Sequence, residues 1–487
     1  MDPTTLSAAD LSMAIHRRDL SCREVMTAYL DRIAQVNPAV NAIVAMRDPD
    51  ELLAEATAAD HHLAHGRSYG WMHGMPVAVK DLGATKGLRT TSGSRLLAEF
   101  VPAADCIMVE RMRAAGCIVV GKTNVPEFGL GSHTYNDVYG TTFNAYDHTR
   151  SAGGSSGGAA VALATRMVPV ADGSDYMGSL RNPAGWNNVF GFRPSQGRVP
   201  SVPEFDRYTP RMSTDGPMGR TVLDVALLLG TQAGPDPRDP HSLPDVLPAE
   251  LTGPDAPSRA PALLRRSLHG VRIGWLADLD GHLATEPGVL DVCAEALQRC
   301  TELGAEVEPV SLPMPAEQVW DAWVVWRHHL VGSGLAPLVA DPTHRPLMKP
   351  EALWEVDQAA RLTGPQLAHA ARVRTRFFHA ITALFERFDA LALPSAQVWP
   401  FPADQHWPTH IGAREMDTYH RWMETTIYAT FAGLPAVCVP AGFGGAGLPM
   451  GVQLIGPPQG DLHVLGLAAT YEPTISHVAV GGAAPAP

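Results

Sequence analysis

The sequence contains no apolar run near the roughly 20 residues that a membrane-spanning helix needs. Its N-terminal segment, MDPTTLSAADLSMAIHRRDLS, lacks an apolar stretch after a basic start, so we expect no secretory signal there. The 6 cysteines include no C-x-x-C pair and have mostly apolar neighbours, so reduced, buried thiols are expected. Together these absences predict a soluble cytoplasmic protein.

Positive charge is also scarce, with 37 Lys and Arg against 50 Asp and Glu and a formal net charge of -13. Nucleic acids and anionic membranes attract clustered Lys and Arg, so we expect neither as a partner. His61, His62, His406 and His410 have no H-E-x-x-H or cysteine context, so we predict no metal site and no cofactor. The remaining composition, 45% hydrophobic and 18% charged, is that of a globular chain with a large core.

Hydrophobic periodicity predicts one domain over residues 1–472, in which helices and strands alternate. Such alternation favours an α/β layer architecture. The expected parts are N-terminal helices at 1–66, a core of strands, helices and Gly/Ser-rich loops at 67–233, an exposed Pro- and Asp-rich loop at 234–262, a mostly helical region with one strand at 263–390, core strands and a helix at 391–472, and a disordered tail at 473–487.

Three strings match well-known motifs but stand in the wrong context. In 116–123 (GCIVVGKT) the expected strand lies inside the phosphate-loop string instead of before it, and a helix precedes it. The G-x-G-x-x-G string at 442–447 joins two expected strands without a following helix, so a β-turn is predicted. The G-x-S-x-G string at 153–157 follows no buried strand, which argues against an α/β-hydrolase nucleophile elbow.

Three other segments carry chemistry in combination. Lys80 follows the valines of the run GMPVAVKD, the Ser155–Ser156 pair is framed by glycines before a helix, and residues 173–181 read GSDYMGSLR. Taken separately they are typical of a surface lysine, a helix N-cap and a polar turn. A buried lysine beside two serines would instead provide a base for a serine nucleophile without any histidine.

The order VAVKD, GGSSGG and GSDYMGSLRNPA resembles the amidase-signature family. The resemblance extends over nearly the whole chain, through GKTNVPEFGLGS (121–132), the Y-G-x-T-x-N segment (139–144), GFRPSQGRVP (191–200), AGLPAVCVPAGF and LPMGVQLIG. It implies an α/β fold with a twisted, mixed β-sheet covered on both faces by α-helices. It also implies hydrolysis of a small carboxamide by a monomer or homodimer that needs no cofactor.

The resemblance implies a role for each matching residue. Ser179 matches the nucleophile, Lys80 the base, and Ser155 a bridging serine whose preceding peptide bond is cis. The remaining implied positions are the oxyanion-hole amides of Tyr176, Met177 and Gly178, with support from Ser156, Asp175 and Arg181. Burial can lower a lysine pKa from about 10.4 by up to about 3–5 units, which would let Lys80 act as a base at neutral pH.

Two segments depart from the family pattern. Met177 replaces a glycine, so the oxyanion turn is altered unless its φ there is negative. Residues 186–188 read Trp-Asn-Asn where the family has Phe-Cys-Gly. The D-x-M-G-S-L-R form resembles a branch that includes nylon-oligomer cyclic-dimer hydrolase, which favours a non-natural amide, anilide, cyclic amide or carbamate. His133, Tyr135 and Asn136 are candidate pocket residues.

Three alternatives remain open at this point. The chain could be a glutamine-amidotransferase subunit that releases ammonia for a partner enzyme. Met177 motivates a second alternative, a catalytically altered binding protein. The third is a hydrolase with a Ser-His-Asp triad, in which a histidine would take the place of Lys80.

Overall fold

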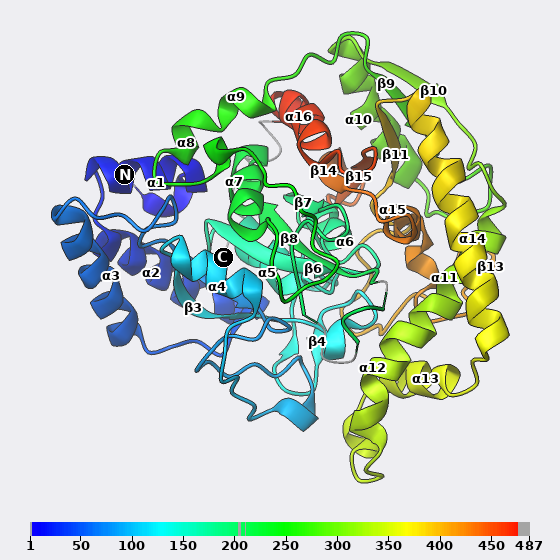
Figure 1. Ribbon diagram of the computed structural model, residues 1–487, viewed down its shortest axis with the longest axis horizontal. Helices are drawn as coiled ribbons and strands as arrows, with labels where there is room; N and C mark the ends of the chain where they lie inside the picture. The colour runs from blue at the N-terminus through cyan, green and yellow to red at the C-terminus, as the bar shows by residue number, and fades with distance from the viewer. Residues whose placement is uncertain (1, 203–205, 210, 476–487) are drawn as a thin grey trace.

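A mixed eight-stranded sheet lies at the centre of the molecule (Figure 1). The computed structural model describes residues 2–202, 206–209 and 211–475. The strand order is β10-β9-β11-β15-β14-β7-β8-β6, in which β9 pairs in parallel with β10 and β11 and the other neighbours are antiparallel. The strands are β6 Val170–Asp175, β7 Phe190–Arg193, β8 Thr214–Gly219, β9 Arg272–Trp275, β10 Glu306–Pro309, β11 Ala390–Pro394, β14 Ala436–Phe443 and β15 Pro449–Ile455.

A second, three-stranded sheet packs beside the edge strand β6. Its order is β1-β3-β2, and β2 runs parallel to β3 and contacts β6. The strands are β1 Ile43–Val44, β2 Pro76–Lys80 and β3 Ile118–Thr123, and two small hairpins pair β4 Tyr135–Asn136 with β5 Gly140–Thr141 and β12 His410–Ile411 with β13 Arg414–Glu415. Every residue of β2 is buried, so Lys80 ends this strand inside the protein.

Helices cover both faces of the large sheet, as the resemblance implied (Figure 1). Helices α1–α3 gather at one end of the molecule and α11, α13 and α14 at the opposite end. The helices are α1 Ala8–Arg17, α2 Cys22–Val40, α3 Pro49–Ala64, α4 Ile107–Ala114, α5 Gly157–Ala164, α6 Arg181–Trp186, α7 Val222–Gln232, α8 Ala256–Arg259, α9 Pro261–Leu264, α10 Val289–Glu302, α11 Ala316–Arg327, α12 Ser333–Leu335, α13 Pro350–Ala359, α14 Gly364–Ala383, α15 Ile427–Phe431 and α16 Asp461–Tyr471.

Local chemistry explains several element boundaries. Ser21 and Glu24 form a capping box that starts α2, and Thr363 does the same with Gln366 at α14. Strands β14 and β15 read as nearly continuous apolar runs because they lie in the middle of a sheet that is covered on both sides. The G-x-G-x-x-G string lies at the connection between these two strands, and β3 lies inside the phosphate-loop string, after α4; both strings therefore have the expected secondary structure.

Some boundaries differ from the sequence-based expectation. The region 263–390 contains a second strand, β10, which pairs with β9. The Pro- and Asp-rich loop includes the short helix α8, which buries Ala256. Residues 472–475 form a 3-10 helix with Ile475 buried, so order extends into the expected tail, and 476–487 lie outside the described residues.

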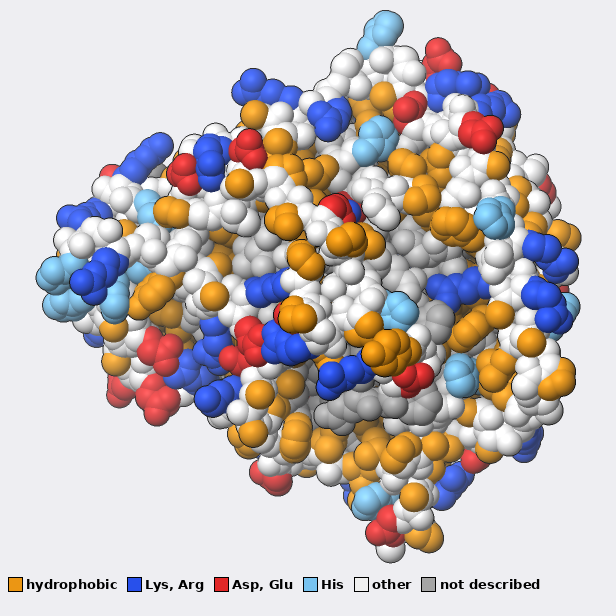
Figure 2. All heavy atoms as spheres, in the orientation of Figure 1, with side chains coloured by type: hydrophobic (Ala, Val, Ile, Leu, Met, Phe, Trp, Pro, Cys, Tyr) orange, Lys and Arg blue, Asp and Glu red, His pale blue; other side chains and the backbone are white. Residues whose placement is uncertain are grey.

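The surface charges, the cysteines and the lengths of the helices can be compared with the sequence-based expectations. Basic and acidic side chains are interspersed over the face seen in Figure 2. All six cysteines are free thiols, and all except Cys106 are buried. Within residues 2–202, 206–209 and 211–475, no helix combines the length and apolar character that crossing a bilayer requires.

Candidate active site

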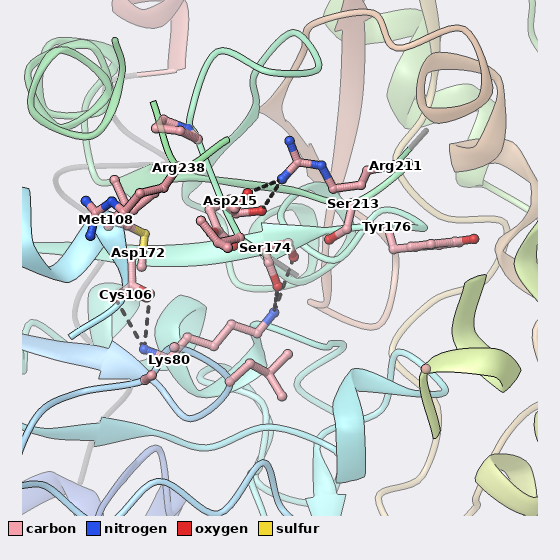
Figure 3. Close-up of a pocket in the computed structure, with 18 of the residues that line it drawn as sticks. Lys80, Cys106, Met108, Asp172, Ser174, Tyr176, Arg211, Ser213, Asp215 and Arg238 are labelled. Carbon is pink, nitrogen blue, oxygen red and sulfur yellow. Dashed lines mark hydrogen bonds between the residues drawn. The ribbon is translucent and has the colours of Figure 1, made fainter. Parts of the chain in front are cut away.

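The site is built on one face of the edge strand β6. Side chains alternate along a strand, so Asp172 and Ser174 share one face and Asp175 points to the other. Antiparallel pairing sets Asp215 of β8 directly opposite Ser174. Because β2 packs against β6, Lys80 lies over the face that carries Asp172, Ser174 and Asp215 (Figure 3).

Lys80 is 1% exposed, and its amino group is surrounded by oxygens that carry no formal charge. Its Nζ lies 2.9 Å from Ser155 Oγ, 2.8 Å from Ser156 Oγ, 2.9 Å from Ser174 Oγ and 3.2 Å from the Ser174 carbonyl. Burial lowers the pKa of Lys80 to about 7, against the opposing charges of Asp215, Asp172 and Asp175. A large fraction of this amine is therefore neutral near pH 7 and able to accept a proton.

The glycine-framed serine pair lies at the start of α5. The peptide bond between Gly154 and Ser155 is cis, as the resemblance implied. Ser156 occupies the N-cap position, but its side chain makes no capping hydrogen bond. Its hydroxyl oxygen instead accepts a hydrogen bond from the Lys80 amine. A Cβ atom on Gly158, the second residue after the pair, would stand 2.4 Å from the backbone nitrogen of Asn124, so only glycine fits there. A simple N-cap therefore does not account for this segment.

Ser179 stands in the turn between β6 and α6. It is 5% exposed, and its carbonyl accepts a hydrogen bond of 3.2 Å from the Ser156 amide. Ser179 and Ser155 both line a cavity of about 300 Å³. Among the described residues no hydrogen bond joins their two hydroxyls. The structure thus brings Lys80 and Ser155 into contact and places Ser179 at the same cavity.

The oxyanion turn tolerates Met177. The residue with positive φ is Gly178, at 78°, and Met177 is not among the residues in that region. A Cβ atom at Gly178 would also lie 2.5 Å from Thr426 Cγ2. The Gly178 amide, however, donates to Asp175 Oδ1 at 2.9 Å, so it is not free for an oxyanion. Within the described residues the amides of Tyr176, Met177 and Ser179 have no hydrogen-bond partner.

Asp175 anchors the turn from the opposite face of β6. Its carboxylate accepts from Arg181 Nε at 3.0 Å and Arg181 Nη2 at 2.9 Å, and Arg193 Nη1 lies 3.6 Å away. Burial alone would raise the pKa of Asp175, but the charges of Arg181 and Arg193 hold it well below its usual range. Asp175 and Arg181 therefore support the turn structurally, at a distance from the Lys80 face.

A larger cavity of about 930 Å³ opens on the Lys80 side of the site (Figure 3). Its polar lining includes Lys80, Asp172, Ser174 and Asp215, with apolar walls from residues such as Met108. Burial raises the pKa values of Asp172 and Asp215 to about 6 each. The motifs did not reveal either carboxylate, although the position of Asp172 two residues before Ser174 in a strand was a usable signal.

The candidate pocket residues lie elsewhere. His133 contacts Ser151 Oγ at 2.7 Å and the Ala403 carbonyl at 3.0 Å, and Asn136 donates to Asn124 Oδ1 at 2.8 Å. Neither these residues nor Tyr135, which stacks on His406, line the two cavities. No histidine lines either cavity in the part of the chain that the structure describes. Within that part, no group of three or more His, Cys, Asp or Glu side chains could hold a metal ion.

Comparison with known proteins identifies the family of the chain. The amidase family model matches residues 24–465. A glutamyl-tRNA(Gln) amidotransferase subunit from Salinispora arenicola is 35% identical over 97% of this chain and 98% of its own. An acylamidase of Rhodococcus erythropolis is 33% identical over 96% and 95% of the two chains.

Solved structures agree with the sequence comparison. A bacterial aryl acylamidase of the amidase-signature family superposes with a TM-score of 0.89 at 30% identity, covering 98% of this chain and 99% of that one. A 6-aminohexanoate cyclic dimer hydrolase shares the fold, with a TM-score of 0.84 at 23% identity over 96% and 97%. The chain therefore belongs to the amidase-signature family and is an enzyme that hydrolyses carbon–nitrogen bonds.

Proposed function

We propose that the chain hydrolyses a small carboxamide through an acyl-enzyme on Ser179, with Lys80 as the base and Ser155 as the proton bridge. The observation that carries the proposal is the buried Lys80 amine, 2.9 Å from Ser155 Oγ and with a pKa of about 7. A serine hydroxyl becomes an effective nucleophile only when a base takes its proton. This contact and this pKa support transfer of the proton to Lys80 by way of Ser155.

The proposed reaction moves one proton out and back along this relay. Neutral Lys80 takes the proton of Ser155, which takes that of Ser179 while the Ser179 oxygen attacks the carbonyl carbon. The carbon–nitrogen bond then breaks, and the proton returns through Ser155 to the leaving nitrogen, which gives the amine and an ester on Ser179. Water attacks that ester by the same route and releases the acid, so all three residues return to their starting states.

The same turn provides donors for the developing oxyanion. The unpartnered amides of Tyr176, Met177 and Ser179 are the candidates, and Gly178 instead fastens the turn to Asp175. Removing one such donor typically costs about 10²–10³ in rate. The relay requires the Ser179 hydroxyl to approach that of Ser155 within the cavity that both residues line.

The proposed substrates are amides, anilides, cyclic amides or carbamates of low molecular mass. The acylamidase of Rhodococcus erythropolis and the bacterial aryl acylamidase support the anilide in particular. The two cavities, about 300 and 930 Å³, are large enough for organic groups on both sides of the bond. We further propose that the residues from 1 to 472 act as one domain, alone or as a homodimer.

The test is hydrolysis of a para-nitroanilide by the purified chain, with release of para-nitroaniline followed by absorbance. A fluorophosphonate probe should modify Ser179, as peptide mass spectrometry of the labelled protein will show. Retained labelling in Lys80→Ala or absent labelling at Ser179 in the active wild type would overturn the assignment of roles. An inactive, unlabelled wild type would instead favour the catalytically altered binding protein.

The amidotransferase relatives support a second candidate function, release of ammonia from glutamine for a partner enzyme. The two candidates differ in what the isolated chain can do. Hydrolysis of anilides by the chain alone favours the amidase. Glutamine-dependent ammonia release that appears only on addition of candidate partner proteins would favour the amidotransferase.

A further inference from the structure

Arg327 is a buried cation in the wall of the nucleophile cavity that the catalytic relay does not use. It is the last residue of α11 and lines the same cavity of about 300 Å³ as Ser155 and Ser179. It is 4% exposed. Isolated cations are rarely buried so deeply without a partner, so the contacts of its guanidinium indicate what it can still bind.

Two of the three guanidinium nitrogens are occupied by protein. Arg327 Nε donates to Glu355 Oε1 at 2.6 Å, and Nη2 donates to the Tyr419 hydroxyl at 2.6 Å. Nη1 has no hydrogen-bond partner within the described residues. It is also not one of their unpartnered atoms that are closed to solvent, so a small molecule can reach it. Because Arg327 lines the cavity, Nη1 is the donor available to a molecule inside it.

The guanidinium is fixed in place by aromatic rings. Its carbon lies 5.4 Å from the ring centres of Tyr176 and Trp323 and 5.7 Å from that of Tyr419. Tyr176 also lines the cavity and directly precedes Met177 in the oxyanion turn. Arg327 is therefore held at a set position relative to the turn that carries Ser179, which is a requirement for selecting among substrates.

Glu355 balances the charge but leaves the free donor unsatisfied. Its carboxylate also receives the Tyr419 hydroxyl at 2.6 Å and contacts His328 Nδ1 at 2.7 Å. Glu355 lines neither cavity, so it does not compete for a molecule at Nη1. The arrangement presents an unpaired N–H donor at the cavity wall, whose natural counterpart is an oxygen acceptor, either a carboxylate or a carbonyl.

We propose that Arg327 determines specificity by binding an oxygen acceptor on the acyl part of the substrate. This inference rests on the proposed acyl-enzyme function. The acyl group stays bonded to Ser179 after the amine has left, and Ser179 lines the smaller cavity but not the larger one. The acyl group then occupies the smaller cavity, which Ser179 and Arg327 share.

The test compares para-nitroanilides of three acyl groups of similar length: pentanoyl, levulinyl with an added ketone, and succinyl with a terminal carboxylate. For the wild type we expect kcat/KM for levulinyl or succinyl, or both, to exceed that for pentanoyl by about tenfold or more. Which oxygenated group gains identifies the acceptor as ketone or carboxylate. Hydrolysis of all three at equal kcat/KM would overturn the inference, and hydrolysis of none would overturn the proposed function.

The variants separate recognition from loss of structure. Arg327→Met should bring the ratio of oxygenated to pentanoyl kcat/KM toward one. This substitution removes the arginine that pairs with the buried Glu355 carboxylate. The double variant Arg327→Met, Glu355→Gln therefore repeats the measurement without a buried unpaired carboxylate. Arg374→Met is the matched control, since Arg374 donates to the Phe431 carbonyl, packs on Trp326 and lines neither cavity.

Arg374→Met should keep the wild-type ratio whatever its effect on stability. A ratio that persists in both Arg327 variants would overturn the inference. So would a ratio that falls equally in Arg374→Met, because the preference would then depend on general packing of this wall. Thermal melting of each variant, with the ratio taken only from folded protein, completes the comparison.

Discussion

The two faces of strand β6 carry acidic side chains in opposite electrostatic states. On one face Asp172 accepts a hydrogen bond of 3.1 Å from the Lys80 amide, and burial raises its pKa to about 6. On the other face Asp175 is paired with Arg181 and Arg193, which hold its pKa well below the usual range. Strand alternation alone separates these environments.

The comparison assigns different work to the two faces. On the Asp175 face the carboxylate is paired with Arg181 and Arg193, and its contacts with the Gly178 and Leu180 amides and the Arg181 guanidinium fix the turn that carries Ser179. On the Lys80 face the pKa of the lysine is about 7, so its amine can gain or lose a proton near pH 7 at little free-energy cost. Substitutions on the Lys80 face should chiefly change turnover, and substitutions on the Asp175 face should chiefly change stability.

The largest effect should come from the relay. Lys80→Ala and Ser179→Ala should each abolish turnover, by about 10⁴-fold or more in kcat, because each removes a member that acts only as part of the unit. The fold should persist, since neither residue belongs to the ion pairs of Asp175. Anilide hydrolysis and circular dichroism check this. Near-normal activity in either variant would contradict the assignment of turnover to Lys80 and Ser179.

The next largest effect should be on stability, at the opposite face. Arg181→Met leaves the Asp175 carboxylate buried without its bidentate partner, which should cost about 3–5 kcal/mol in the free energy of unfolding. Urea denaturation measures this change. Arg238→Met is a suitable control, because its ion pairs with Asp236 and Glu110 are partly exposed and contribute far less. Equal losses in the two variants would refute the structural role of the Asp175 ion pairs.

The sequence predicted the reactive face far better than its surroundings, for physical reasons. Lys80, Ser155 and Ser179 stand in three strings whose order resembles the amidase-signature family, and this resemblance, not any string alone, implied that they meet in one site. Which way the Gly178 amide points depends on Asp175 and the turn torsions, and this was not predictable. Arg327 and Asp215 approach the site only through tertiary packing, and no local pattern marks them.

The pH dependence should follow the neutral fraction of Lys80. Because the base must be unprotonated, kcat/KM should rise with pH through about 7 and fall about tenfold per unit below it. The Asp172 charge raises the pKa of Lys80, so Asp172→Asn should move the profile to lower pH. Asp206→Asn, in the same cavity but without a charge effect on Lys80, should leave the midpoint in place.

The midpoint of this pH profile tests directly whether Lys80 is the base. A wild-type profile that stays flat from pH 5 to 9, or a shift to higher pH in Asp172→Asn, would contradict the assignment of Lys80. A midpoint that moved equally in Asp206→Asn would show a general field of the cavity instead of the local face of β6. Profiles from single-turnover experiments with the same anilide avoid any contribution from product release.

The smallest effect should come from Ser174→Ala. Lys80 would lose one of its hydroxyl partners but keep Ser155, Ser156 and the Ser174 carbonyl. The expected cost is about 1 kcal/mol in stability and less than tenfold in kcat/KM. Ser155→Ala, which removes the bridge itself, is the matched variant and should be far slower. If both were equally inactive, Lys80 would have to exchange its proton through Ser174, and the path would run along the face of β6 toward Asp215 instead of toward Ser179.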